Sequence, residues 1–338
     1  MSPPVDQRLR TRLRAAIAEI PGARLAYEAV VGSPGSWLYR RPTLDWLSDP
    51  ALARQLPPPY RWFARYCAAR SRDPIGAELI LRGIVALSRR FAADGGIVPL
   101  RIGALTVYLD LQDPRFLNVP REVTGLPQVL RHFLRPGDSF LDVGANHGVF
   151  SIVASGLVGK QGFVVAIEPQ PRLAGLVQRS LSEGPAPFEV HQLACGDRSE
   201  EVEFYIPLAT SGSAGRFVRF SAVSRHRTIK VHMRPIDEVV DWRKLPGRTF
   251  VKLDVEGSEL GFLYGSRKLI QATSPALLME MNPVAMSAAD TSQAKLLSTL
   301  AELGYDRFVT AREPDREHAL TEQIVATDVI LLPASFGQ

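Results

Sequence analysis

The stretch FLDVGANHGVFS, residues 140–151, decides the fold. An apolar run with Asp142 near its end leads into Gly144 and Gly148, and a second apolar run follows. Glycine adopts left-handed backbone conformations at little cost and asparagine tolerates them, so Gly144, Asn146 and Gly148 predict a tight turn between a strand and a helix. In open parallel sheets, ligands bind beyond the carboxyl ends of the strands, at turns of this kind. The stretch therefore predicts a ligand-binding turn.

Short apolar runs alternate with helical stretches on the carboxyl side of this turn, which is typical of a doubly wound α/β domain. Strands are predicted at 139–143, 162–168, 188–194, 249–255 and 275–281, and helices at 148–159, 171–183, 257–270 and 291–303. Two β-like segments, 201–207 and 228–236, interrupt the alternation and predict a hairpin, and two runs near the end predict a final antiparallel pair. We expect a mostly parallel sheet with helices on both faces.

The first 95 residues are rich in Ala, Arg and Pro and have helical periodicity. We interpret residues 1–95 as a helical extension and residues 96–338 as the ligand-binding domain, with a hairpin insertion at about 200–236. Within the extension, apolar residues recur at helical spacing between arginines over 7–20. Such a helix packs on the protein's own body, on a second copy in a homodimer, or on a membrane surface.

Composition narrows the functional classes. The 338 residues are 46% hydrophobic and contain two cysteines, Cys67 and Cys195, outside any CxxC pattern, so neither a disulfide framework nor a zinc site is predicted and a cytoplasmic location is expected. A secretion signal and a membrane-spanning run are both absent from the pattern, so membrane insertion is not expected. The net charge of +5 comes from arginines interleaved with acids, which argues against a nucleic-acid partner.

Two cofactors use turns of this kind. The dinucleotide pattern is GxGxxG, whereas S-adenosylmethionine sites use DxGxxxG. This chain has Asn146 where the dinucleotide pattern has its second glycine, and Asp142 ends the preceding strand. A carboxylate there can accept hydrogen bonds from the ammonium of the methionine end, whereas beside a pyrophosphate it would repel. The turn therefore favours S-adenosylmethionine.

The next two strand ends carry further acids. Glu168 ends the second predicted strand, at the position where an acid accepts hydrogen bonds from the two ribose hydroxyls of an adenosine. Both cofactors contain this ribose, so Glu168 does not distinguish them. Asp197 follows the third strand, where it can meet the adenine edge, although a turn-stabilising role is the alternative. The predicted cofactor-binding residues are Asp142, Gly144, Asn146, Gly148, Glu168 and Asp197.

The segment VKLDVEGSELGFLYG, residues 251–265, makes the pattern specific. Together with FLDVGANHGVFS, AIEP, LACGD followed by VEFYIP, and PALLMEMNP, it resembles the FkbM family of S-adenosylmethionine-dependent methyltransferases. The resemblance extends from about Pro99 to Pro333. It implies a class I methyltransferase fold with a seven-stranded sheet and, as in typical members, O-methylation of a hydroxyl on a sugar or small natural product.

The same segment supplies candidate catalytic residues. Methyl transfer to a hydroxyl needs in-line placement of the oxygen and removal of its proton. We predict that Asp254 or Glu256 orients and deprotonates the acceptor, with Glu280 as a further polar wall. In the alternative interpretation, Asp254 shapes the loop or touches the cofactor and Glu256 pairs with an arginine.

Other groups compete for these roles. Histidines offer a rival base and are otherwise surface residues: His147, His191, His226 and His232. Carboxylate and amide oxygens near the strand ends suit Mg²⁺, but the chain has no adjacent Asp-Asp pair there, so no metal is predicted.

Three rival functions follow from the same residues. An NAD-dependent oxidoreductase lacks support because the second glycine is missing. A nucleic-acid methyltransferase is suggested by LPPPY, residues 56–60, but the Asp or Asn that should hold the target amine is absent and a proline turn explains the motif. A member that binds the cofactor without transferring a methyl group is the third. The expected partner is a small hydroxylated substrate.

Overall fold

The computed structural model describes residues 49–62, 96–207, 214–217, 226–321, 324 and 328–336. Most of the predicted helical extension lies outside these ranges, including the amphipathic segment at 7–20 that was linked to a homodimer. The tip of the hairpin insertion also lies outside them.

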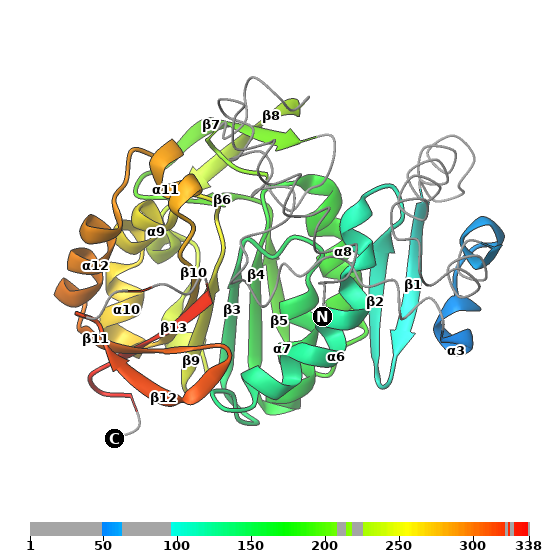
Figure 1. Cartoon of the computed structure of the whole chain (residues 1–338), viewed down its shortest axis with the longest axis horizontal. Coiled ribbons are helices and arrows are strands. Elements are labelled where there is room, and N and C mark those ends of the chain that lie inside the picture. The colour runs from blue at the N-terminus through cyan, green and yellow to red at the C-terminus, as the bar shows by residue number, and fades with distance from the viewer. Residues whose placement is uncertain are drawn as a thin grey trace, which may run out of the picture.

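An eight-stranded sheet forms the centre of the structure, in the order β12-β11-β13-β10-β9-β3-β4-β5 (Figure 1). Its parallel strands are β3 (Ser139–Val143), β4 (Phe163–Ile167), β5 (Phe188–His191), β9 (Thr249–Leu253) and β10 (Ala276–Glu280). The antiparallel part comprises β11 (Tyr305–Thr310), β12 (Glu313–Ala319) and β13 (Asp328–Pro333), which confirms the predicted final antiparallel pair. Because β3 lies between β4 and β9, the strand order reverses there and opens a crevice at the carboxyl ends.

The prediction of seven strands was wrong by one strand in the described part of the chain. The additional strand is β12, which pairs with β11 at the sheet edge. Its sequence, EPDREHA, is mostly exposed and lacks the alternation of apolar and polar residues that marks a half-buried strand. Charges along an edge strand also discourage pairing with another chain.

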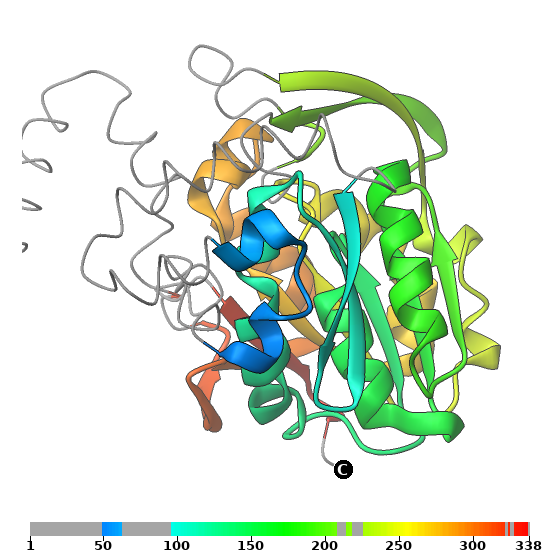
Figure 2. The ribbon, with the colours of Figure 1, turned by 90° about the vertical axis from the view of Figure 1, so that its right-hand side faces the viewer.

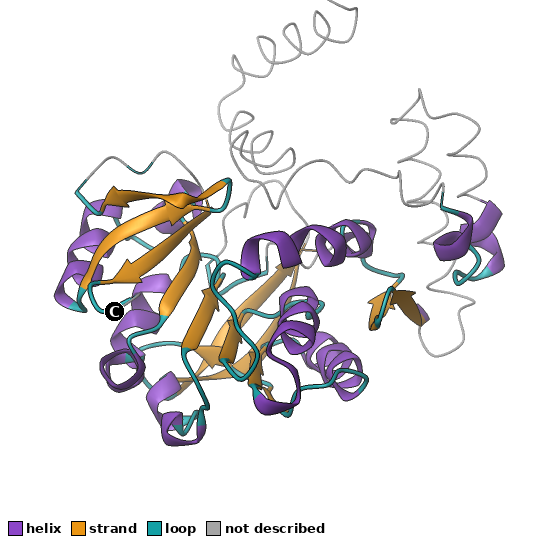
Figure 3. Ribbon diagram, turned by 90° about the horizontal axis from the view of Figure 1, so that it is seen from below, coloured by secondary structure: helices purple, strands orange, loops and turns teal. Residues whose placement is uncertain are grey.

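Helices cover both faces of the sheet, as predicted (Figure 3). One face packs on α6 (Val119–Leu130), α7 (Val149–Val158) and α8 (Pro171–Ser182). The other face packs on α9 (Glu259–Gly265), α10 (Arg267–Thr273) and α12 (Gln293–Glu302), while α11 (Pro283–Ala288) follows β10. Successive strand residues point to opposite faces, so Phe140 joins the first core and Leu141 the second.

Two predicted elements are interrupted in the structure. The single helix predicted at 257–270 is divided into α9 and α10 at Ser266. The strand predicted at 188–194 ends at His191, and Ala194–Cys195 forms β6 in a different sheet.

A hairpin of β1 (Ile97–Ile102) and β2 (Leu105–Asp110) packs against the first core (Figure 2). The short helix α3 (Pro50–Ala53) and the residues after it cover this hairpin. Tyr60 is buried, its hydroxyl donates to the carbonyl oxygen of Leu111 at 3.0 Å, and its ring meets Phe116 edge-on. Leu56 and Tyr60 of the LPPPY segment are therefore part of the core, whereas Pro58 and Pro59 between them are exposed. This placement gives no support to a nucleic-acid methyltransferase motif.

The insertion forms a second sheet in the order β6-β8-β7, where β7 (Glu200–Pro207) and β8 (His226–Arg234) are antiparallel. This confirms the predicted hairpin. Short 3-10 helices complete the elements: η3 (Pro114–Leu117), η4 (Gly159–Gln161), η6 (Ile236–Glu238) and η7 (Trp242–Lys244). Within the described ranges, every helix is too short or too polar to cross a membrane.

Candidate active site

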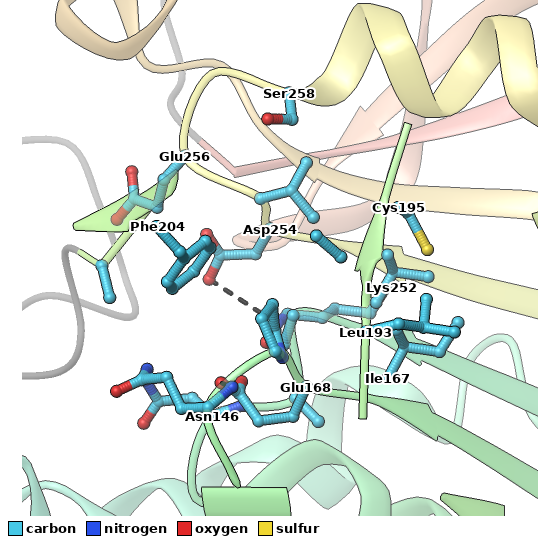
Figure 4. Close-up of a pocket in the computed structure, with 18 of the residues that line it drawn as sticks. Asn146, Ile167, Glu168, Leu193, Cys195, Phe204, Lys252, Asp254, Glu256 and Ser258 are labelled. Atoms are coloured by element: carbon cyan, nitrogen blue, oxygen red, sulfur yellow. Dashed lines mark hydrogen bonds and ion pairs between the residues drawn. The ribbon is translucent and has the colours of Figure 1, made fainter. Parts of the chain in front are cut away.

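A pocket that is partly open to solvent lies beyond the carboxyl ends of β3, β4 and β9 (Figure 4). The glycine turn after β3 and the loop after β9 form two of its walls. Phe204 of β7, Met233 of β8 and Arg216 from the segment between these strands form another. The insertion thus covers the crevice where a ligand of this fold binds.

The glycine turn has the backbone that the sequence predicts. Gly144, Asn146 and Gly148 have φ angles of 80°, 52° and 74°. A Cβ atom at Gly144 would overlap the carbonyl oxygen of Asp254, so the turn and the loop after β9 are in contact through bare backbone. Gly144 and Asn146 line the pocket, whereas Gly148 packs on Val177 and caps α7.

Asp142 lies behind the pocket wall. Its side chain is completely buried and is absent from the lining residues. Its carboxylate accepts a hydrogen bond from Ser151 Oγ at 2.6 Å and lies 3.4 Å from Lys252 Nζ. These contacts fix the start of α7 and the lysine. Direct contact of Asp142 with the cofactor's ammonium stays a prediction.

Lys252 is a site residue to which the sequence pattern assigned no role. Its ammonium donates to the carbonyl oxygen of Gly144 at 2.7 Å and lies 3.6 Å from Asp254 Oδ2. Burial by itself lowers the pKa of Lys252, but Asp254 and Asp142 outweigh burial and raise it. The lysine is therefore charged, and it links the glycine turn to the candidate catalytic carboxylate. The sequence feature that could have identified Lys252 is its alternation with Asp254 along one strand.

Glu168 joins two turns at the pocket. Its carboxylate accepts hydrogen bonds from the backbone N–H groups of Asn146 at 2.8 Å and Gln170 at 2.9 Å. The side chain is buried, and burial raises its pKa to about 7 despite these hydrogen bonds and the charge of Lys252. Glu168 thus lines the pocket at the end of β4, where an acid was predicted to receive the ribose.

The raised pKa of Glu168 predicts a pH dependence of stability. The folded protein holds this proton up to about pH 7, whereas the unfolded chain releases it near the ordinary glutamate pKa of 4.5. The free energy of unfolding should therefore fall between those two pH values, by about 3 kcal/mol from this group, and change no further above them. We expect Glu168→Gln to remove that fall, as measured by urea unfolding at pH 5 and pH 8. The exposed Glu183→Gln is the control, and an unchanged slope in Glu168→Gln would contradict the assignment.

The structure brings the predicted carboxylates together. Oxygen atoms of Asp254, Glu256 and Glu280 lie within 4.8 Å of one another. Asp254 and Glu256 line the pocket, and Glu256 is buried with a left-handed φ of 52°. The insertion touches this loop, because a Cβ at Gly215 would meet Glu256 Cβ at 3.2 Å.

Carboxylates this close also suit a divalent cation. We keep the prediction that transfer needs no metal, and we expect activity to be unchanged after treatment with EDTA. The measurement is the initial rate with and without chelator, followed by addition of Mg²⁺. Loss of activity that Mg²⁺ restores would instead make this cluster a metal centre.

The remaining predicted residues are distributed differently. Asp197 is exposed, is absent from the pocket lining, and lies 3.6 Å from Arg198, because the chain has already entered the second sheet at β6. Of the four rival histidines, His147 lines the pocket and is buried. His191 contacts Glu189, and the other two, His226 and His232, are exposed on β8.

The lining residues change in character along the sheet. Apolar side chains of Leu193, Cys195 and Met233 lie beyond the β5 end, and Glu168 follows at β4. The glycine turn is at β3 and the carboxylates are at β9. This order suits a ligand with an aromatic base, a ribose and a charged amino-acid end, so the donor set fits S-adenosylmethionine.

Comparisons with known proteins agree with this assignment of the pocket. Residues 142–307 match the family described as the methyltransferase FkbM domain. A protein-L-isoaspartate O-methyltransferase of Archaeoglobus fulgidus is 30% identical over 123 residues, which cover 35% of this chain and 53%, or about half, of that protein. The hexuronic acid methyltransferase AglP of Haloferax volcanii is 25% identical over 201 residues, covering 57% of this chain and 79% of that protein.

Among solved structures, the FkbM methyltransferase of Methylobacillus flagellatus KT aligns with a TM-score of 0.37 at 17% identity, covering 82% of this chain and 72% of that chain. The match to the family spans the glycine turn, the acid at β4, the insertion and the carboxylate segment. The chain belongs to the FkbM family of S-adenosylmethionine-dependent methyltransferases.

Proposed function

We propose that this protein transfers the methyl group of S-adenosylmethionine to a hydroxyl oxygen of a sugar or small natural product. The observation that supports this most directly is the position of Asp254 and Glu256, which line the pocket beside the glycine turn. The bound cofactor supplies an electrophilic methyl group. A hydroxyl oxygen becomes a good nucleophile only as its proton leaves, and a carboxylate within hydrogen-bond reach accepts that proton.

The two carboxylates have different neighbours. Lys252 Nζ lies 3.6 Å from Asp254 Oδ2, so this ion pair holds the Asp254 side chain beside the glycine turn. Glu256 lines the pocket on the loop that Gly215 of the insertion contacts. We infer that Asp254 orients the acceptor hydroxyl and that Glu256 or Asp254 removes its proton.

A second candidate acceptor is a carboxylate. The guanidinium of Arg216 lines the pocket, and the two curated relatives are named for hexuronic acid and L-isoaspartate, which both contain carboxyl groups. A carboxylate needs no base, however, and the cluster of Asp254, Glu256 and Glu280 would repel it. The cluster therefore favours a neutral hydroxyl.

The chemistry of the product distinguishes these acceptors. The protein is incubated with donor labelled in the methyl group and a panel of neutral sugars and uronic acids, and the labelled product is treated with mild alkali. A methyl ether survives this treatment, whereas a methyl ester releases labelled methanol. We expect the label to be retained. Release of methanol would refute hydroxyl methylation and favour the carboxylate.

A further inference from the structure

A buried ion pair lines the pocket and has no part in proton removal. Arg115 on η3 and Glu122 on α6 form two parallel hydrogen bonds of 2.8 and 3.1 Å. Their side chains are only 16% and 7% exposed, and both line the pocket. Burying two charges costs free energy even when they are paired, so such a pair requires an explanation beyond stability.

His147 lies in the same region and gives a second, independent observation. It lines the pocket with 1% of its surface exposed. Its Nδ1 is 2.6 Å from Asn146 Oδ1, which also accepts from the backbone N–H of His147. Nδ1 therefore carries the proton, and Nε2 presents a lone pair. Among the described residues, Nε2 is buried without a hydrogen-bond partner. Burial lowers the pKa of His147, which keeps the ring neutral.

A buried acceptor without a donor points to a ligand, because such atoms are nearly always paired in folded proteins. The donor must come from inside the pocket that His147 lines. The start of α7 contributes at the same turn, since Gly148 caps the helix without a side-chain hydrogen bond and the positive end of the helix attracts an anion. The region therefore offers two acceptors, Glu122 and His147, and two anion-binding groups, Arg115 and the helix start.

We propose that Arg115, Glu122 and His147 bind the zwitterionic amino-acid end of the cofactor. Glu122 and His147 Nε2 accept hydrogen bonds from the α-ammonium, and Arg115 donates hydrogen bonds to the α-carboxylate. Glu122 thereby takes the role that the sequence suggested for Asp142, whose carboxylate lies behind the wall with Ser151 and Lys252. The proposal rests on S-adenosylmethionine as donor and is independent of the acceptor.

The test compares two ligands by isothermal titration calorimetry. S-adenosylhomocysteine contains the amino-acid end, whereas 5′-methylthioadenosine contains the same adenosine and sulfur without it. We expect Glu122→Gln to lower the affinity for S-adenosylhomocysteine roughly ten- to a hundredfold and to change the affinity for 5′-methylthioadenosine by less than about twofold. Loss of a hydrogen bond to a charged group causes a difference of this size. The control is Asp110→Asn, which breaks the nearby Arg172–Asp110 ion pair outside the pocket lining and should affect neither ligand.

Equal weakening of both ligands in Glu122→Gln would overturn the proposal, as would unchanged binding of S-adenosylhomocysteine. If that variant fails to fold, the double variant Arg115→Met with Glu122→Leu replaces the ion pair by apolar side chains of similar size, which buried pairs often tolerate. It should show the same selective loss. A wild-type protein that binds neither ligand would refute the cofactor assignment itself, a result distinct from loss of selectivity.

Discussion

The variants Asp254→Asn and Glu256→Gln are expected to lower the turnover rate. The variant that removes the base should lower this rate by about a hundred- to ten-thousandfold. Each substitution keeps the shape of the side chain and removes its ability to take a proton. The measurement is the rate of a single turnover with labelled donor, with the affinity for S-adenosylhomocysteine determined in parallel. Because a base acts on the acceptor, its loss should leave this affinity within about twofold.

Glu203→Gln makes the same chemical change on an exposed part of β7 and serves as the matched control. Near-normal rates in both site variants would show that neither carboxylate is the base. A rate that falls together with affinity would instead place that carboxylate on the cofactor, which is the alternative that the sequence left open.

Gly144→Ala is expected to destabilise the fold by about 2 to 5 kcal/mol and to abolish cofactor binding. The left-handed φ of 80° strains any residue with a Cβ, and this Cβ would also overlap the carbonyl oxygen of Asp254. To relieve the overlap, the turn must move away from the loop after β9. Lys252, which bonds to the carbonyl of Gly144, would lose its position as well.

Gly137→Ala is the control, because Gly137 has a φ of 91° and open space around it. This substitution should lower the free energy of unfolding by only about 1 to 2 kcal/mol, which is the strain of the left-handed conformation alone. Urea unfolding of both variants gives the comparison. If Gly144→Ala is no less stable than Gly137→Ala, the close approach of the two loops is not a constraint.

The central strands were predictable because their signal is local. β3, β4 and β10 are continuous apolar runs bounded by turns, and each was predicted to within one residue at each end. β12 carries no such run, since it is exposed on an edge. The helix α6 was also missed, since it contains Pro127, a residue that usually ends a helix.

The candidate site was predictable where one segment forms a turn by itself. The left-handed residues of the glycine turn and the position of Glu168 follow from their own neighbours. Arg115 and Glu122 precede the turn by more than twenty residues, and only packing of α6 on α7 brings them to the pocket. The expected position of Asp197 relied on a continuous third strand, whereas the chain leaves the main sheet after His191.

The contact between Gly215 and Glu256 has a consequence for protein engineering. The hairpin of β7 and β8 looks like a separable part that could be exchanged between relatives to alter acceptor choice. A Cβ atom at residue 215 would lie 3.2 Å from Glu256 Cβ, and Phe217 packs near Gly257 on the same loop. A transplanted hairpin with a larger residue at 215 would therefore press on Glu256 and shift a candidate base along with the old specificity.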